Sequence, residues 1–219
     1  MKMPFTTEQF FRVFEKYNHP LFPAQLFISF LGILTVILLF THFPLRHKWA
    51  ACFLGLLWIW TGIAYHLAFF TSINKAAYVF GALFILQGIL FLIATFTKKG
   101  LPFEFQRNDK GVTGLFLIFF GLLIYPVLSF LLSGSAATTI ALGLPCPSAI
   151  LTFGFLLLVS ARVPRDLLVI PVIWALIGTS AAVKFGVYPD YMLIFSAAAS
   201  LFLILKSNGK PAGPDTLSE

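Results

Sequence analysis

The stretch ATTIALGLPCPSAILTFGFLLLVSA, residues 137–161, is the most informative part of the chain. It is long and apolar enough for one transmembrane helix, which needs about 20 residues to cross a hydrocarbon core. In its interior, however, GLPCP places two prolines beside a glycine, and proline disrupts helical hydrogen bonding and geometry. We therefore expect a discontinuous helix. Unwound backbone is tolerated at membrane depth only where it is buried in protein or lines a cavity, so the break predicts a cavity within a larger bundle.

The composition is that of a polytopic membrane protein. Of 219 residues, 59% are hydrophobic and 11% are charged, and the net charge is +7. Charged residues approach a quarter of an ordinary soluble domain. The basic residues form short clusters between apolar runs and no continuous stripe, so the positive charge does not indicate nucleic-acid binding. We expect the lipid bilayer as the main partner and no nucleic-acid partner.

Seven apolar segments are long enough, or nearly long enough, to cross a membrane. They are Leu21–Thr41, Trp49–Thr71, Ala76–Thr97, Val112–Ser133, Ala137–Ala161, Pro164–Val183 and Pro189–Leu205. KFGVYPD alone separates the last two, and a helical hairpin would also accommodate it. The predicted fold is an all-α membrane helix bundle of about seven spans, with six as the alternative and with the fifth helix broken at GLPCP.

The spans divide the chain into residues 1–20, a transmembrane domain over 21–205 and a tail over 206–219. The first region contains TTEQFFRVFEKYNHP, with threonines at an N-cap position and aromatic residues at helical spacing. These aromatic residues are Phe10, Phe11, Phe14 and Tyr17. Because charges occupy the other face, we predict an amphipathic helix lying in the membrane interface. The tail lacks apolar content and is predicted to be disordered and cytoplasmic.

The distribution of Lys and Arg predicts the orientation. In the seven-span arrangement, one side of the membrane holds ten of the fifteen basic residues: Arg46, Lys48, Lys98, Lys99, Arg107, Lys110, Arg162, Arg165, Lys206 and Lys210. Cytoplasmic loops carry such an excess. We therefore predict a multi-pass protein of the cell's inner membrane with its N-terminus outside and its C-terminus in the cytoplasm. The charged N-terminal segment does not resemble a cleavable signal peptide.

Polar side chains inside or beside the spans are candidate site residues, because an unpaired polar group in hydrocarbon is costly. We expect an outward-facing polar cavity around the break, and the candidate substrate-binding residues are Tyr65, His66, Asn74, Gln87, Tyr125, Cys146, Ser148 and Asp190. Structural roles would also account for several of them. His66 could be a core histidine, Gln87 could bond a neighbouring helix, and Asp190 could cap a helix start.

Cys146 is the most distinctive of these candidates. With Pro147 as the first residue of a new helix, Cys146 would be its N-cap, where a helix dipole favours the thiolate. A thiolate is a nucleophile and a soft-metal ligand, so Cys146 and His66 are also candidate metal ligands. Metal sites usually take three or four protein ligands, so Asp190 or a homodimer would have to complete this one. The alternative is a structural kink with Cys146 as a small buried hydrophobe.

Three stretches also carry a family resemblance: WIWTGIAYH, INKAAYVFGALFILQG and GLPCPSAILTFGFLLL. They resemble a bacterial integral-membrane family that is described as a domain of unknown function and is sometimes labelled a transporter permease. The similarity covers most of the chain. Where that family often has threonine after the second proline, this chain has Ser148, which keeps a hydroxyl group. The resemblance implies a prokaryotic cytoplasmic membrane but no activity, substrate or cofactor.

These observations favour a small transporter or permease whose substrate is a soft metal ion or a small solute. A membrane thiol-redox protein using Cys146 and a non-catalytic membrane subunit are the alternatives. Redox chemistry would need Cys52 and Cys146 to approach within about 7 Å, yet the predicted spans place them near opposite ends. We find no phosphate-binding loop, so ATP-driven transport by this chain alone is not expected. An enzyme is the less favoured class.

Overall fold

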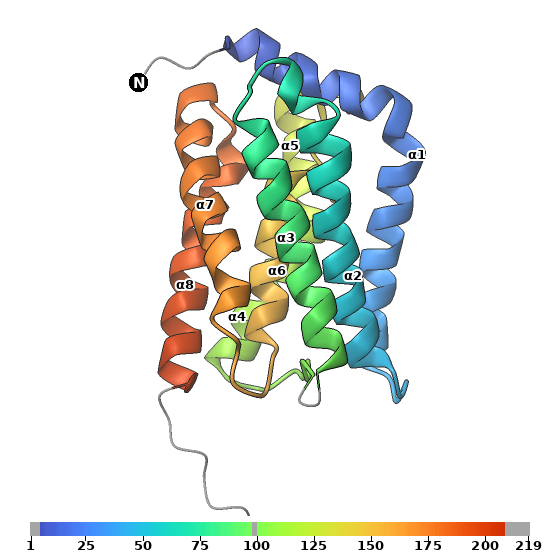
Figure 1. Cartoon of the computed structure of the whole chain (residues 1–219), viewed down its shortest axis with the longest axis vertical. Coiled ribbons are helices and arrows are strands. Elements are labelled where there is room, and N and C mark those ends of the chain that lie inside the picture. Colours follow the sequence, from blue (N-terminus) through green and yellow to red (C-terminus); the bar gives the residue numbers. More distant parts are fainter. Residues whose placement is uncertain (1–4, 98–99, 209–219) are drawn as a thin grey trace, which may run out of the picture.

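The computed structural model describes residues 5–97 and 100–208, and these residues form an all-α bundle (Figure 1). Its α-helices are α1 (Thr7–Leu39), α2 (Arg46–Trp60), α3 (Ala77–Phe96), α4 (Asp109–Phe119), α5 (Tyr125–Ser133), α6 (Pro145–Leu157), α7 (Asp166–Phe185) and α8 (Tyr191–Asn208). Short π-helical and 3-10 segments adjoin them: η1 (Thr61–Leu67), η2 (Phe70–Ser72), η3 (Phe120–Ile124), η4 (Ala136–Thr138) and η5 (Tyr188–Asp190). The predicted fold class is confirmed.

Six helical stretches in the described part of the chain are long and apolar enough to cross a membrane. They are Thr7–Leu39, Arg46–Ser72, Ala77–Phe96, Asp109–Ser133, Asp166–Phe185 and Tyr188–Ser207. This is compatible with a multi-pass membrane protein. The last two predicted spans are two helices, α7 and α8, joined by a short turn, since Gly186 adopts a left-handed conformation, with φ of 71°, and ends α7. Residues 206–208 of the predicted tail belong to α8, which continues to Asn208, and the other tail residues, 209–219, lie outside the described residues.

The fifth predicted span, Ala137–Ala161, forms only half a helix. α6 has 13 residues and begins at Pro145, and before it the backbone makes one 3-10 turn and then continues without regular helix to Leu144. The residue before a proline is pushed toward extended backbone, and Leu144 has φ of −101° and ψ of 156°. The predicted break at GLPCP is therefore present, but it lies at the start of the helix and not in its interior. GLPCP is the start of a single half-helix that follows an unwound stretch.

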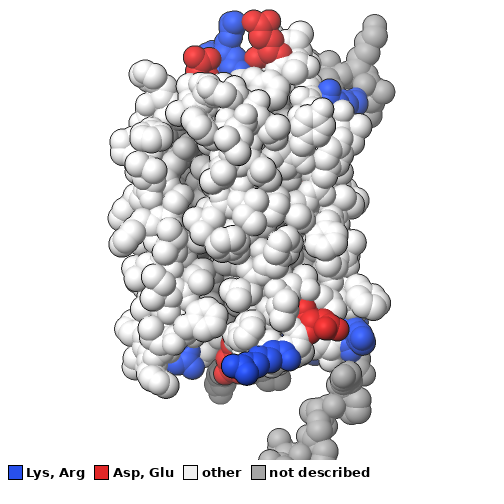
Figure 2. All heavy atoms as spheres, turned by 180° about the vertical axis from the view of Figure 1, so that it is seen from behind, with Lys and Arg blue, Asp and Glu red and all other residues white. Residues whose placement is uncertain are grey.

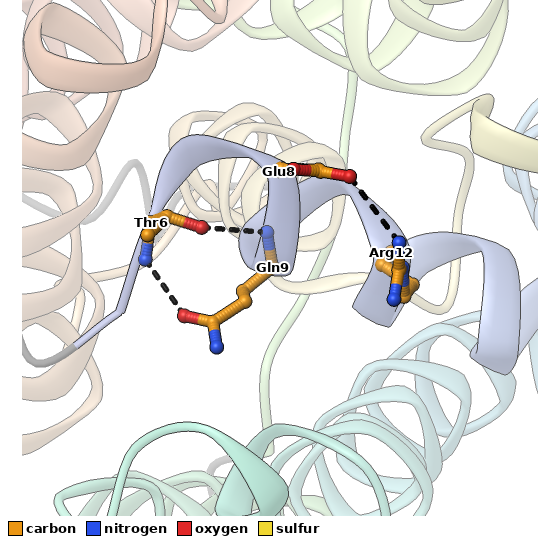
Figure 3. A network of polar contacts seen from close by, with 4 residues as sticks. All are labelled: Thr6, Glu8, Gln9 and Arg12. Carbon is orange, nitrogen blue, oxygen red and sulfur yellow. Dashed lines mark hydrogen bonds and ion pairs between the residues drawn. The ribbon is translucent and has the colours of Figure 1, made fainter.

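The start of α1 follows the sequence prediction closely. Thr6 is the N-cap, and its hydroxyl oxygen accepts a hydrogen bond from the Gln9 backbone N–H at 3.2 Å. The Gln9 side chain in turn accepts one from the Thr6 N–H at 2.9 Å, which completes a capping box (Figure 3). Arg12 and Glu8 form an exposed ion pair at 3.2 Å one turn along. The charged side chains Glu8 and Arg12 therefore lie on the exposed face of this segment.

The first part of α1 lies across one end of the bundle and the remainder runs along the bundle's length (Figure 1). We call the end that it crosses the N-terminal end. The change of direction falls where Pro20 and Pro23 lie inside the helix, and proline is the usual cause of a helix kink. Before the kink, Phe10, Phe14 and Tyr17 are buried against the bundle. This segment therefore covers the other helices at that end.

The surface between the two ends of the molecule is apolar. Figure 2 shows charged side chains gathered at both ends and a broad band without them between. Large side chains on this band face outward, with Phe96 75% and Phe202 66% exposed. An exposed apolar belt of this extent is expected of a protein that lies in lipid. The predicted orientation, with the N-terminus outside, stays a prediction.

The half-helix α6 lies at the centre of the bundle, and glycines let its neighbours approach closely. Nearly every α6 side chain is buried. A Cβ added at Gly154 would come within 2.7 Å of the Gly114 carbonyl oxygen in α4, and one added at Gly121 in η3 would come within 2.9 Å of the Pro147 carbonyl oxygen. Small residues at helix interfaces allow such contact in membrane bundles. These contacts fix where the start of α6 lies.

Candidate functional site

A cavity of about 610 Å³ lies at the N-terminal end of the bundle, where α1, α3, α6 and α7 meet. It is lined by Phe5, Phe10, Phe14, Tyr65, Phe70, Asn74, Ala76, Phe80, Ile140, Pro145, Cys146, Trp174, Ile177, Gly178, Ser180, Ala181, Lys184 and Asp190. The predicted cavity was polar, whereas this lining is largely aromatic and aliphatic with a few polar groups. Such a lining and volume are typical of sites for small organic molecules.

The aromatic residues at the start of the chain cover the cavity. Phe10 stacks on Phe185 of α7 with ring centroids 4.6 Å apart, and Phe14 stacks on Tyr65 of η1 at 5.8 Å. Phe5 lies edge-on to Phe70 at 5.7 Å. Such pairs contribute about 0.5–1.5 kcal/mol each beyond their buried area. The first part of α1 is therefore held over the cavity by ring contacts with two other parts of the bundle.

Asp190 is the acidic residue in the cavity lining. It comes from the short η5 segment that begins the last span, and its side chain is only 4% exposed. The Tyr125 hydroxyl group donates a hydrogen bond to its carboxyl oxygen, and the Cys146 thiol is a further side-chain neighbour. Among the described residues, the one ion pair is Arg12–Glu8, so no Lys, Arg or His pairs with Asp190.

The start of α6 differs from the prediction in its cap. Leu144, not Cys146, is the N-cap, and Pro145 is the first helical residue. A helix start normally offers several free backbone N–H groups to an anion. Here Pro145 and Pro147 have none, so Cys146 carries the one N–H among the first three helical residues. This helix start is a poor anion site.

The unwound stretch before α6 is held by hydrogen bonds from α1. Asn18 donates from its side-chain amide to the carbonyl oxygens of Ala137 and Thr139, both at 2.8 Å. Gln25 donates to the Asn18 side-chain oxygen at 2.6 Å. Both amide side chains are buried. The carbonyl groups that lack helical partners in this stretch therefore find them on α1, which is what unwound backbone inside a bilayer requires.

Gly143 is the second anchor of this stretch. With φ of 96° it adopts a backbone conformation that favours glycine. Its carbonyl oxygen accepts hydrogen bonds from the hydroxyl groups of Tyr17 at 3.0 Å and Thr61 at 3.3 Å. Its N–H donates to the Ser148 hydroxyl oxygen at 3.3 Å. Ser148, a predicted site residue, therefore closes the turn and does not line the cavity.

Two π-helical segments lie beside the start of α6. η1 carries Tyr65 and His66, and η3 directly precedes Tyr125. Each extra residue in a π-turn rotates the side chains that follow, and π-segments occur frequently at functional sites. In η1, the Thr61 hydroxyl group donates to the Gly143 carbonyl oxygen of the unwound stretch, and in η3, Gly121 packs against Pro147 and Leu151 of α6. The two segments orient Tyr65 and Tyr125 toward the cavity and Asp190.

The structure brings some of the eight predicted site residues together and not others. Tyr65, Asn74, Cys146 and Asp190 line the cavity, and Tyr125 joins them through Asp190. Gln87 lies elsewhere in the core, where its side-chain amide donates to the Leu167 carbonyl oxygen at 3.1 Å. A hydrogen bond to a neighbouring helix was the structural alternative considered for it.

His66 is fully buried beside the cavity and does not line it. Its ring packs against Phe84 at 4.5 Å and Trp174 at 5.1 Å between centroids. Neither ring nitrogen has a hydrogen-bond partner among the described residues. The same residues contain no group of three or more His, Cys, Asp or Glu side chains that could hold a metal ion. The role of Cys146 and His66 as metal ligands stays a prediction, and the described residues supply no third ligand beside them.

Comparison with known protein families finds a match over most of the chain. A family of unknown function, DUF6064, matches residues 7–212. The chain belongs to this family. The match bears out the resemblance to a domain of unknown function, while the bacterial membrane setting and the permease label stay expectations. No curated protein and no solved structure matches the chain.

In this DUF6064 chain, Trp174 is a site residue that the sequence reasoning did not select. It lies in α7, lines the cavity, and is 8% exposed. Its indole N–H has no hydrogen-bond partner among the described residues, although a buried Trp N–H usually has one. Tryptophan is common in transmembrane helices, so nothing in the sequence around Trp174 distinguishes it from a packing residue.

Proposed function

We propose that this protein is a permease-like membrane transporter that binds a small, largely apolar solute in the cavity at its N-terminal end. The observation that carries the proposal is the cavity itself, which is built on the start of a half-helix and on an unwound stretch inside an apolar bundle. Discontinuous helices of this kind form substrate sites in many transporters. The covering segment of α1 and the two π-segments supply parts that are able to rearrange.

The donor set favours an organic solute over a soft metal ion. Cys146 and Asp190 line the cavity together with seven aromatic side chains, and His66 is not part of the lining. A protein site for a soft metal usually has three or four ligands. An aromatic lining instead suits a solute with an apolar body.

Thiol-redox chemistry receives less support. Both cysteines are free. Cys146 lines the cavity, whereas Cys52 lines a separate apolar groove between α1 and α2 together with residues such as Trp49 and Leu56. A disulfide requires Cα atoms within about 7 Å. Because Cys52 and Cys146 line two different pockets, Cys52 is not placed to act as the resolving thiol for Cys146.

Accessibility of Cys146 from each side of a membrane tests the transport proposal. The Cys52→Ala variant leaves Cys146 as the one thiol and would be reconstituted in proteoliposomes of defined orientation. A small membrane-impermeant methanethiosulfonate reagent would be added on one side at a time. A transporter exposes its site to each side in turn, so we expect modification from both sides, faster from the side of the N-terminal end.

Modification of Cys146 from one side alone would contradict transport and would indicate a protein that binds a solute without carrying it across. Absence of modification from both sides, in protein whose Cys146 reacts after denaturation, would contradict an accessible cavity. The Cys52→Ala, Cys146→Ala, Ser72→Cys variant has a single thiol at an exposed position of η2 and is the control for reagent crossing the membrane.

A further inference from the structure

We infer that the solute bound in this cavity carries a cationic group that pairs with the Asp190 carboxylate. The inference rests on the proposed function, because it names the substrate class for the same site. It assigns a role to Asp190 that its position at the start of a helix does not explain. Three observations carry it: an acid without a cationic partner among the described residues, a lining of aromatic rings, and a helix start with few donors for an anion.

The first observation is the environment of Asp190. Its side chain is 4% exposed, and its partners are the neutral side chains of Tyr125 and Cys146. Acidic side chains buried in membrane helices are costly and mark substrate, ion or proton sites. A buried carboxylate is normally paired. Since no basic side chain pairs with Asp190 among the described residues, a bound cation would supply the missing charge.

The second observation is the aromatic lining. Tyr65, Phe70, Phe80 and Trp174 line the same cavity as Asp190, and Phe10 and Phe14 cover it. The faces of aromatic rings attract cations, and cages of such rings recognise quaternary ammonium groups. An aromatic surface combined with one carboxylate therefore fits an organic cation with an apolar body better than a neutral or anionic solute.

The third observation excludes the usual alternative for a half-helix. In many transporters the start of a half-helix binds an anionic group of the substrate. Here two of the first three residues of α6, Pro145 and Pro147, are prolines without N–H groups. The third, Cys146, has the Asp190 carboxyl group beside its thiol. An incoming anion would meet a carboxylate and few donors.

Among the described residues, Lys184 is the basic residue in the cavity lining. It belongs to the last turn of α7 and is exposed, whereas Asp190 is buried. The two side chains form no ion pair. Lys184 therefore does not neutralise the carboxyl group that we assign to the bound cation.

The charge preference of Cys146 modification tests the inference, because the thiol lies beside Asp190. In the Cys52→Ala background, the rate with the cationic reagent 2-(trimethylammonium)ethyl methanethiosulfonate would be compared with that of the anionic 2-sulfonatoethyl reagent. Each rate is divided by the rate of the same reagent with free 2-mercaptoethanol. We expect a preference for the cation of about tenfold or more, as a nearby unit charge in a partly desolvated site would produce.

Asp190→Asn keeps an oxygen acceptor for Tyr125 and should reduce the ratio to about one. Asp190→Glu should restore it. Glu15→Gln is the matched control, because Glu15 is an exposed acid of the same end of the bundle that does not line the cavity. Protection should follow the same order, with benzyltrimethylammonium slowing modification and toluenesulfonate leaving it unchanged.

Equal rates with both reagents, or a ratio that Asp190→Asn leaves unchanged, would overturn the cationic assignment while the accessible cavity stands. Failure of both reagents to reach Cys146 in folded protein would overturn the proposed function and the inference together. Faster reaction with the anionic reagent would point to an anionic solute and would contradict the inference alone.

Discussion

Asp190 and Tyr125 lie 65 positions apart in the sequence and meet at the base of the cavity. The sequence was enough to select both, because a polar or ionisable residue within an apolar run requires an explanation. It could not show that they are partners, since that contact depends on the π-segment η3 and on the short η5 turn. Ser148 and Gln87 were selected by the same reasoning, yet both satisfy backbone groups in the core.

The Tyr125→Phe variant tests the hydrogen bond to Asp190. Loss of the hydroxyl group leaves a buried carboxyl oxygen without this donor, so the free energy of unfolding should fall by about 1–3 kcal/mol. Denaturant titration of the detergent-solubilised protein measures the change. Tyr78→Phe is the control, because Tyr78 is 61% exposed and should tolerate the same deletion. Equal losses in both variants would contradict the assigned contact.

Variants of His66 distinguish a packing role of this side chain from a role in ligand binding. Its ring is buried and both nitrogens lack partners, so His66→Phe should leave the free energy of unfolding unchanged within about 1 kcal/mol or raise it. His66→Ala deletes the ring and should lower it by about 2–4 kcal/mol. The same titration compares the two. A large loss in His66→Phe, or loss of a bound metal in that variant, would revive the ligand role.

At the level of elements, the sequence locates helices better than it locates their irregularities. Apolar runs placed most of the long helices within a few residues, and the N-terminal threonines marked the start of α1, where Thr6 is the N-cap. The half-helix was predicted as a break at GLPCP, but the residues before it carry no signal that separates unwound backbone from helix. The π-segments η1 and η3 were not predicted, since no residue type in TGIAYHL or FGLLI distinguishes a π-turn from α-helix.

The Asn18→Ala variant tests how α1 supports the unwound stretch. It removes the donors to the Ala137 and Thr139 carbonyl oxygens and the acceptor of Gln25, so the free energy of unfolding should fall by about 2 kcal/mol or more. Amide hydrogen exchange should quicken over residues 137–144. His19→Ala changes an exposed neighbour and should alter neither quantity. Unchanged exchange in Asn18→Ala would show that the stretch is held by other contacts.

At the scale of the whole molecule, the apolar belt and the six long helices agree with the composition. The bundle places its cavity at the N-terminal end, where the first part of α1 covers it (Figure 1). That arrangement required the three-dimensional structure, because the covering segment precedes the other lining residues by about fifty positions or more. Membership of DUF6064 supplies no activity, so the account depends on the cavity.

Titration with the neutral fluorescent probe N-phenyl-1-naphthylamine tests that claim most directly. Wild-type protein in lipid nanodiscs, with the signal of empty nanodiscs subtracted, should bind the probe saturably. Ala181→Phe fills part of the cavity lining and should weaken binding by about tenfold, or 1.4 kcal/mol. Ala82→Phe, on an exposed position of α3, should leave it unchanged. Absence of saturable binding, or equal binding by both variants, would contradict a ligand site at this end of the bundle.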